Sequence, residues 1–528
     1  MGSTETTSQT DKTTELTPQT TLTLLGVALG IFMGALENTI VGTAMPTVIA
    51  TLGGIEIYSW VAVAYLLTST VMTPIWGKMA DLLGRRPAIF GGLALFILGS
   101  ALSGMAHSMW QLIAFRALQG LGSGALFPVG MTIVADLLTL EKRTKTIALF
   151  SGMWGMASLF GPLVGGFLTE HWSWRWVFYI NLPFGLLAAG LIWANYTERH
   201  ARRANLKLDY AGTLTLAVGM VALLVLVERG SVLSPPLVLG GVLLCALLGA
   251  AFIWIERRCP EPLIPLKLFR ERMVLATTLH GLFAGMMMFG SMLYLPLFVQ
   301  GVLGASPTAA GAILTPYILA WVVCSIIGGR MILRIGYRPV VLTGMLLMLL
   351  GSLMLAFVSA ATTLNLLAGA VILMGMGGGL TLSSLMIGSQ HAVPRALLGV
   401  VTSTVQFARN IGASLGVGIL GAVMAWRLRH ELAQGGSGEF TALALQHSDI
   451  AALVRQTTRA ALSPQAAQFL QAALANSLRL AFIVGLAMVV IAALVALLIP
   501  GGTAHDLVHE DHQATPEAEA EAVIFTEP

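Results

Sequence analysis

The chain has 528 residues, 56% of them hydrophobic and only 10% charged, and its formal net charge at pH 7 is +4. A soluble domain carries about a quarter charged residues, so this chain cannot cover a globular surface with polar groups. The composition excludes a soluble protein and predicts an integral membrane protein. The 58 glycines agree with this prediction, because glycine lets the backbones of membrane helices approach closely.

Fourteen apolar runs in the sequence are long enough to cross a membrane, since one helical crossing takes about 20 apolar residues. We therefore predict an all-α membrane protein with fourteen transmembrane helices in the plasma (inner) membrane. An even number of crossings puts both termini on one side, and the Lys and Arg clusters between the runs make that side cytoplasmic. The predicted helices cover residues 22–46, 58–78, 87–106, 110–135, 145–168, 174–195, 209–228, 235–255, 273–298, 307–329, 339–359, 363–388, 397–425 and 477–499.

Two basic loops of the chain are similar to each other. Residues 77–87 read GKMADLLGRRP and residues 329–339 read GRMILRIGYRP, so both glycines and the final Arg-Pro coincide. The loops follow the second and the tenth predicted helix, which implies a parallel repeat of two six-helix bundles with an extra pair between them. The predicted parts are a cytoplasmic tail at 1–21, a bundle at 22–196, a two-helix insert at 197–272, a bundle at 273–500 with an external loop at 426–476, and an acidic cytoplasmic tail at 501–528.

Glu37 lies about 15 residues into the first predicted helix, in a run that is otherwise uncharged. At about 1.5 Å of rise per residue, its carboxyl group is too deep to reach the membrane surface easily. A carboxylate at this depth costs about 2.5–3.5 kcal/mol on insertion scales, and burial favours its neutral form. We expect Glu37 to carry a proton or to oppose a cationic substrate. The alternative is a structural carboxylate that a neighbouring helix satisfies.

Five motifs of the chain resemble a known family of transporters. GKMADLLGRRP is similar to the signature loop between the second and third helices of the major facilitator superfamily. RALQGLGSG from Arg116 resembles the family's motif in the fourth helix, and GPLVGG at 161–166 resembles the antiporter motif of the fifth. WSWRWVFYINLPFG at 172–185 and ENTIVGTAMP at 37–46 resemble motifs of its fourteen-span drug:proton antiporter branch (EmrB/QacA type). The resemblance implies the major facilitator fold, as two six-helix bundles with two extra central helices. It also implies proton-driven efflux of lipophilic, cationic drugs by alternating access.

Two arginines, Arg116 and Arg409, lie inside predicted helices. Arg116 resembles an arginine that this family uses in proton coupling, so we expect it to act with Glu37, with a purely structural role as the alternative. For Arg409 the two interpretations stand equal. Aromatic faces near these charges could hold a cationic substrate. The residues expected to bind substrate, from their placement on inner helices, are Glu37, Asn38, Trp60, Tyr65, Gln119, Tyr294, Gln406 and Arg409.

The signature loop is expected to act as a conformational switch. Asp81 can meet the N-terminus of an opposing helix, while Arg85 and Arg86 can reach Asp136 at the inner end of the fourth helix. In the family, such a network latches the inner face closed and opens it when it is disrupted. Anchoring by positive charge would explain the arginines but not the acid or the glycines. The residues of this expected switch are Gly77, Asp81, Gly84, Arg85, Arg86 and Asp136.

The GPLVGG motif combines a helix-kinking proline with three glycines. Close helix packing is the simple interpretation, whereas the family resemblance connects the motif with export. The motif residues are Gly161, Pro162, Gly165 and Gly166.

Enzyme motifs are not supported by their surroundings. GASLG at 412–416 fits the nucleophile pattern of hydrolases but lies in a predicted membrane helix. No Walker or HExxH sequence appears, and we expect no catalytic residue, no cofactor and no resident metal. The expected partners are a small-molecule substrate, protons and membrane lipid, without nucleic acid, for a protein that acts as a monomer. Two alternatives stay open: an exporter of a lipid, siderophore or secondary metabolite, and a membrane receptor that transports nothing.

Overall fold

The computed structural model describes residues 17–53, 57, 60–198, 209–229, 233–260, 262–305, 312–434 and 464–501, and the secondary structure of this part is helical throughout. The helices are α1 (Pro18–Leu52), α2 (Trp60–Leu83), α3 (Arg85–Gly104), α4 (Met109–Leu137), α5 (Leu140–His171), α6 (Trp176–Tyr179), α7 (Asn181–Asn195), α8 (Tyr210–Arg229), α9 (Pro235–Glu256), α10 (Arg272–Gly301), α12 (Leu314–Ile335), α13 (Tyr337–Ala356), α14 (Leu364–His391), α15 (Leu398–Gln434) and α19 (Pro464–Ala496), with 3-10 turns η1 (Leu266–Arg270) and η2 (Arg395–Leu397).

Each predicted crossing overlaps a helix of the structure, with α6 and α7 together forming one. Twelve helical stretches in the described part of the chain are long and apolar enough to span a membrane. The two others are α5, whose first turns carry the charged sequence EKRTK, and α8, whose apolar part covers only Ala211–Val227. The all-helical membrane fold is therefore confirmed, whereas the count of fourteen crossings stays a prediction.

The predicted external loop at 426–476 was too wide. Helix α15 continues to Gln434 and α19 already begins at Pro464, so residues 426–434 and 464–476 of the predicted loop are helical. The helices extend because their leucines stay buried in one apolar cluster beyond the predicted ends, and residues 435–463 lie outside the described part. The leucines concerned are Leu428, Leu432, Leu470 and Leu474.

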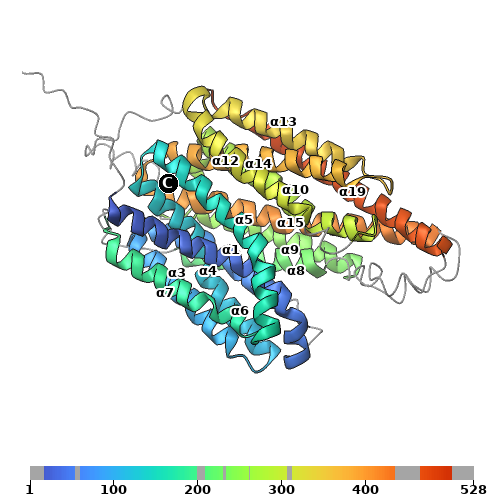
Figure 1. Cartoon of the computed structure of the whole chain (residues 1–528). Coiled ribbons are helices and arrows are strands. Elements are labelled where there is room, and N and C mark those ends of the chain that lie inside the picture. The colour runs from blue at the N-terminus through green and yellow to red at the C-terminus, as the bar shows by residue number, and fades with distance from the viewer. Residues whose placement is uncertain are drawn as a thin grey trace, which may run out of the picture.

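The helices form two bundles and a separate pair. Helices α1–α7 pack on one another, as do α10–α19, and Figure 1 shows the first group in blue and cyan and the second in yellow to red. The similar loops occupy matching places in the two bundles: Gly84 precedes α3 with φ 104°, and Gly336 precedes α13 with φ 83°. Both values lie in a region that favours glycine, which explains why both loop copies carry one there.

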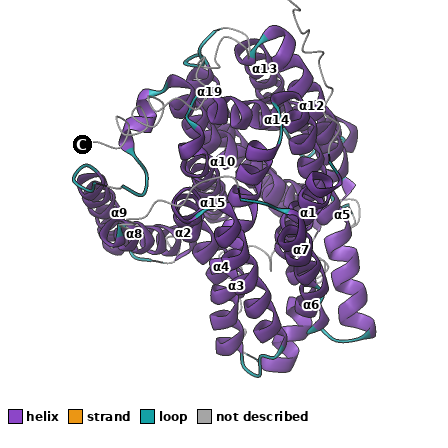
Figure 2. Ribbon diagram, turned by 90° about the vertical axis from the view of Figure 1, so that its left-hand side faces the viewer, coloured by secondary structure: helices purple, strands orange, loops and turns teal. Residues whose placement is uncertain are grey.

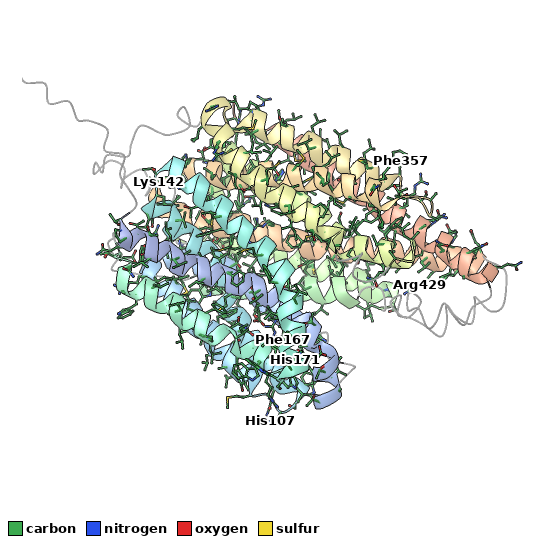
Figure 3. The ribbon with its side chains drawn as sticks, viewed as in Figure 1. His107, Lys142, Phe167, His171, Phe357 and Arg429 are labelled. Atoms are coloured by element: carbon green, nitrogen blue, oxygen red, sulfur yellow. The ribbon has the colours of Figure 1, made fainter. Side chains whose placement is uncertain are left out.

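Helices α8 and α9 lie outside both bundles, where α8 packs against α2 and α15 (Figure 2). The bundles approach each other at the end that carries Lys142, here called the basic end (Figure 3). They diverge toward the opposite end, here called the far end, which carries His107 and His171 in the first bundle and Phe357 and Arg429 in the second. The contacts between α2 and α15 and between α5 and α12 join the two bundles.

Candidate functional site

The carboxylate of Glu37 lies inside the first bundle, with no exposed surface. Arg116 of α4, which is 2% exposed, donates from Nη1 to Oε1 of Glu37 and forms an ion pair with it. Asn181, the first residue of α7, donates from Nδ2 to Oε2 of Glu37 at 2.5 Å. Three helices thus place one cation, one anion and one amide together in a buried site. Since the charges of the pair cancel, this polar cluster has no net charge.

The Arg116 guanidinium is held on several sides. Nη1 also donates to Oε1 of Gln119 at 2.8 Å, and Nε donates to the Val61 carbonyl at 3.2 Å. The guanidinium lies 4.1 Å from the centre of the Tyr65 ring, whose hydroxyl shares a 2.7 Å hydrogen bond with Ser123. These contacts fix the cation in one position, so the ion pair is a preorganised feature of the fold.

Two members of this cluster were missed at the level of the sequence. Asn181 is part of the quoted motif at 172–185, and an amide in an apolar run was the signal that could have identified it. Ser100 accepts from Nδ2 of Asn181 at 3.0 Å and from Nε2 of Gln119 at 3.2 Å, and donates to the Phe178 carbonyl at 2.8 Å. No sequence signal distinguishes Ser100 from other serines in glycine-rich helices.

The signature loop joins the two bundles at the basic end. Asp81 of α2 accepts hydrogen bonds from the backbone N–H groups of Gly399 at 3.0 Å and Val400 at 2.7 Å, in the first turn of α15. Arg85 contacts Asp81 at 3.1 Å and Asp136 of α4 at 2.9 Å. The structure therefore contains the expected contact of Asp81 with an opposing helix N-terminus, where the helix dipole favours a negative charge.

Gly77 makes the close approach of α2 and α15 possible. A Cβ atom at this position would overlap the Ser403 side chain and would lie 2.6 Å from the Gly399 carbonyl oxygen. Only a residue without a side chain fits this crossing. The bundle contact at the basic end thus depends on a glycine and a carboxylate one turn apart on α2.

The expected contact of Arg86 with Asp136 was wrong. The backbone N–H of Arg86 donates to Glu198 at 2.8 Å, and its Nη2 donates to the Trp193 carbonyl at 3.0 Å. The guanidinium also lies 4.7 Å from the centre of the Trp193 ring. Arg86 lies in the first turn of α3 and faces α7, so only Arg85 of the two arginines points toward α4.

The GPLVGG motif divides between two faces of α5. A Cβ atom on Gly161 or Gly165 would overlap the hydroxyl of Thr39 or Thr43 on α1, respectively. By contrast, a Cβ atom on Gly166 would have no neighbour within 4 Å. Two of the three glycines therefore support the packing of α5 on α1, next to Glu37 in sequence. The side chain of Pro162 is outside the described part of the structure.

The residues expected to bind substrate fall into separate groups. Tyr65 and Gln119 belong to the buried cluster around Glu37, which in this conformation faces Arg116 and Asn181 and is closed to a substrate. The remaining members of the expected set lie elsewhere. Gln406 and Arg409 are on α15, and the Tyr294 hydroxyl donates to the Val417 carbonyl at 2.8 Å. Trp60 packs with apolar residues of the first bundle, and the side chain of Asn38 is not described.

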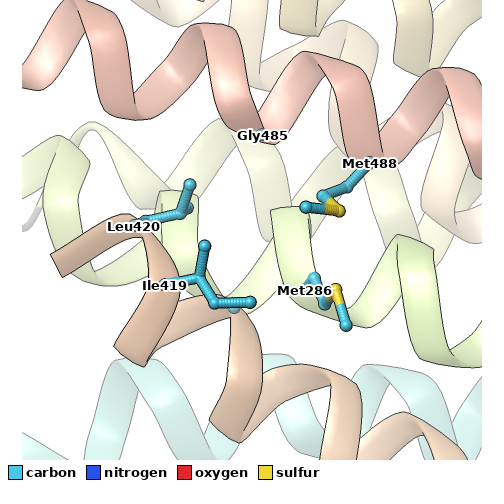
Figure 4. Close-up of a pocket in the computed structure, with 6 residues that line it drawn as sticks. Met286, Ile419, Leu420, Gly485 and Met488 are labelled. Atoms are coloured by element: carbon cyan, nitrogen blue, oxygen red, sulfur yellow. The ribbon is translucent and has the colours of Figure 1, made fainter. Parts of the chain in front are cut away.

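A small apolar cavity lies between α10, α15 and α19, inside the second bundle (Figure 4). It has no room for a water-sized molecule and is lined by Met286, Gly416, Ile419, Leu420, Gly485 and Met488. Pockets for drug-sized ligands measure about 300–1,000 Å³ and offer a few polar groups. This cavity is smaller and has no polar side chain, so it is a packing gap and not the candidate site.

Comparisons with known proteins agree with this architecture. Residues 27–417 match the family described as the Major Facilitator Superfamily. The Multidrug transporter protein MdtP of Bacillus subtilis (strain 168) is 40% identical over 407 residues, which cover 76% of this chain and 75% of that protein. Multidrug resistance protein 3 of the same strain is 36% identical over 431 residues, covering 81% of this chain and 84% of that protein. The solved structure of the proton:xylose symporter XylE has a TM-score of 0.60 at 13% identity, over 92% of this chain and 98% of that one, and shares the fold.

Proposed function

The chain belongs to the major facilitator superfamily, a family of transporters and not of enzymes, and on this basis we propose that it is a proton-driven exporter of lipophilic drugs. Its similarity to two multidrug proteins supports efflux as the direction of transport. The observation that carries the proton-coupling part is the ion pair of Glu37 and Arg116, which is buried where water does not reach.

The ion pair supports proton coupling because its stability depends on the charge of Glu37. A proton on this carboxylate removes the negative partner and leaves Arg116 as an uncompensated buried cation. Breaking a buried pair by removing one charge costs about 3–5 kcal/mol. This free-energy cost is avoided if α1 and α4 move and Arg116 gains another partner. Protonation of Glu37 would then favour a different arrangement of the first bundle, which is the requirement for coupling.

The latch between α2 and α15 supports alternating access. In the described conformation the contacts of Asp81 hold the bundles together at the basic end, while the far ends diverge. We propose that the basic end is cytoplasmic, so that this is an outward-facing state, and that substrate enters after the latch opens. The bundles would rock about a site near the membrane midplane.

The branch and topology are further parts of this proposal. We propose fourteen crossings, with α5 and the pair α8–α9 included, because α5 runs along α1 and α8 packs along α9. Both termini would then lie in the cytoplasm, and the protein would act as a monomer in the plasma membrane. The insert α8–α9, which separates the two bundles in the sequence, supports membership of the drug:proton antiporter branch.

The preference for cations that the sequence suggested rested on Glu37 as a free counter-charge. In the structure this carboxylate is neutralised by Arg116, so a cationic drug would have to displace the arginine. The contacts favour a proton as the direct ligand of Glu37. Lipophilic character is therefore the part of the cargo assignment that we retain.

Proteoliposomes with an internal pH dye test the proposal. The wild-type protein should release protons when a lipophilic drug is added, and Glu37→Gln should abolish this release while the protein stays folded. Glu170→Gln is the matched control, because Glu170 is an exposed acid at the far end of α5. Coupled efflux that is unchanged in Glu37→Gln would refute the mechanism.

A further inference from the structure

The deep charges of the described helices do not balance. Among the described helices, Glu37 is the only carboxylate far from a helix end, and Arg116 neutralises it. Arg409 is a second deep arginine, about 16 Å along α15 from Leu398. No ion pair among the described residues includes Arg409. Among the described residues this deep positive charge therefore has no carboxylate partner, and an ionisable side chain in the membrane interior marks a candidate functional site.

Arg409 reaches from the second bundle to the first. The stem of its side chain packs on α10, where its Cγ would lie 3.5 Å from a Cβ atom on Gly285, and Gly281 leaves room beside it. Its guanidinium lies 5.4 Å from the centre of the Phe127 ring on α4. Arg409 thus occupies the boundary between the bundles, where α4, α10 and α15 meet, and it is partly exposed there.

The surroundings of Arg409 on α15 are polar on one face. Gln406, Asn410 and Ser414 are spaced four residues apart and therefore lie on one face of α15, and the last two are partly exposed. Nη2 of Arg409 donates to Oε1 of Gln406, whose Nε2 donates to Oδ1 of Asn410 at 2.9 Å. A guanidinium has five N–H donors in a planar fork, and Gln406 accepts a hydrogen bond from only one of its nitrogens, Nη2. Gln406 therefore orients Arg409 and leaves donors for a further acceptor.

Glu37 is not that acceptor. Its partner Arg116 and the ring of Phe127 are eleven residues apart on α4, which corresponds to about 16 Å along the helix axis. No side chain bridges this distance, and Asn181 holds the second oxygen of Glu37. The described residues therefore offer Arg409 no carboxylate acceptor.

We propose that Arg409 binds the acidic group of an amphipathic cargo, a carboxylate, sulfonate or phosphate, with Phe127 contacting the apolar body. This inference rests on the proposed efflux function and names a substrate class for it. A guanidinium pairs with such oxyanions through two parallel hydrogen bonds, and the low dielectric between the bundles strengthens them. The substrates most favoured at this site are lipophilic anions, in contrast to the cations expected from the sequence.

Three probes with the same apolar body and different head groups test the assignment: pyrenebutanoate, pyrenebutanol and pyrenebutylammonium. Their binding is measured by quenching of protein tryptophan fluorescence in nanodiscs of phosphatidylcholine, with empty nanodiscs as the partition reference. The wild-type protein should bind the butanoate about tenfold more tightly than the butanol. Arg409→Gln should remove this preference by weakening butanoate binding more than butanol binding, whereas Arg409→Lys should keep part of the preference.

Arg479→Gln is the matched control, because Arg479 also lies over a phenyl ring, that of Phe357, but at the far end of the second bundle. It should behave as the wild type. A butanoate preference that survives in Arg409→Gln, or a wild-type preference for the ammonium probe, would overturn the inference.

Two further measurements separate this inference from its alternatives: transport of the probes in proteoliposomes, and competition by phosphatidylglycerol in the nanodiscs. If the wild type exports butanol in proteoliposomes but shows no butanoate preference, the anion site is wrong and the efflux proposal stands. If butanoate binds through Arg409 but no probe is transported, the efflux proposal fails and the anion site stands. If phosphatidylglycerol in the nanodiscs displaces butanoate through Arg409 and butanoate is not transported, the site holds a lipid phosphate and the cargo assignment is overturned.

Discussion

Asp81 and Val400 are 319 residues apart in the chain and share a hydrogen bond of 2.7 Å between the carboxylate of one and the backbone N–H of the other. The bond places a negative charge on the N-terminal turn of α15, where the partial charge of the helix dipole is positive. Arg85 contacts the same carboxylate at 3.1 Å and extends the network to Asp136. One acid on α2 therefore links the bundles across the basic end and is tied to α4 at the same time.

Asp81→Asn should favour opening at the basic end. The substitution keeps the shape of the side chain but removes the charge that both α15 and Arg85 bind. We expect a shift of about 1–2 kcal/mol toward the open state, equivalent to roughly five- to thirtyfold in the equilibrium. Spin labels at Thr139 and Ile335, which are exposed at the basic end of each bundle, would report a longer distance.

Glu431→Gln provides the control for this measurement, because it removes an ion pair with Arg427 at 2.6 Å within α15, distant from the basic end. The label distance should not change in that variant. An unchanged distance in Asp81→Asn as well would show that the carboxylate does not hold the bundles together. The labels require a background in which Cys245, Cys259 and Cys324 are replaced by serine.

Gly165→Ala and Gly166→Ala should differ in stability although they are neighbours. A Cβ atom on Gly165 would overlap Thr43 and lie 2.8 Å from the Ile40 carbonyl oxygen, so α5 and α1 must separate. Overpacking of this kind costs about 1–3 kcal/mol. Gly166 has space for a methyl group, and its substitution should be neutral. Thermal unfolding in detergent would measure both, and equal melting temperatures would contradict the described packing of α5 on α1.

Asn181→Ala should weaken proton coupling without removing the ion pair. The variant deprives Glu37 of a donor at 2.5 Å, and a hydrogen bond to a charged group contributes about 1.5–3 kcal/mol. We expect drug-dependent proton release to fall severalfold while drug binding is retained. The control is Asn195→Ala on the same helix, whose amide donates to the Leu191 carbonyl at 2.9 Å, away from the cluster. Wild-type coupling in Asn181→Ala would remove this residue from the proton site.

Sequence reasoning reached some members of the candidate site and missed others for physical reasons. Glu37 and Arg116 stood out because charge in an apolar run is costly wherever the helix packs. Ser100 and Asn181 carry no charge, and their contacts with Gln119 and Glu37 exist only because α1, α3, α4 and α7 meet at one depth. The direction of a side chain at a helix start is equally nonlocal, which is why Arg86 was assigned to Asp136 and lies on Trp193 instead.

The sequence by itself determined that this is a helical membrane protein with a repeated signature loop. Hydropathy suffices for this because a helix in lipid must satisfy its own backbone, so each crossing is encoded within its own residues. Only the tertiary structure decided which charges meet. Glu37 finds Arg116 and Asn181, Asp81 finds the start of α15, and Arg409 lies over Phe127 without a carboxylate among the described residues. These pairings follow from the angles and depths at which separate helices cross, and no local pattern in the chain encodes them.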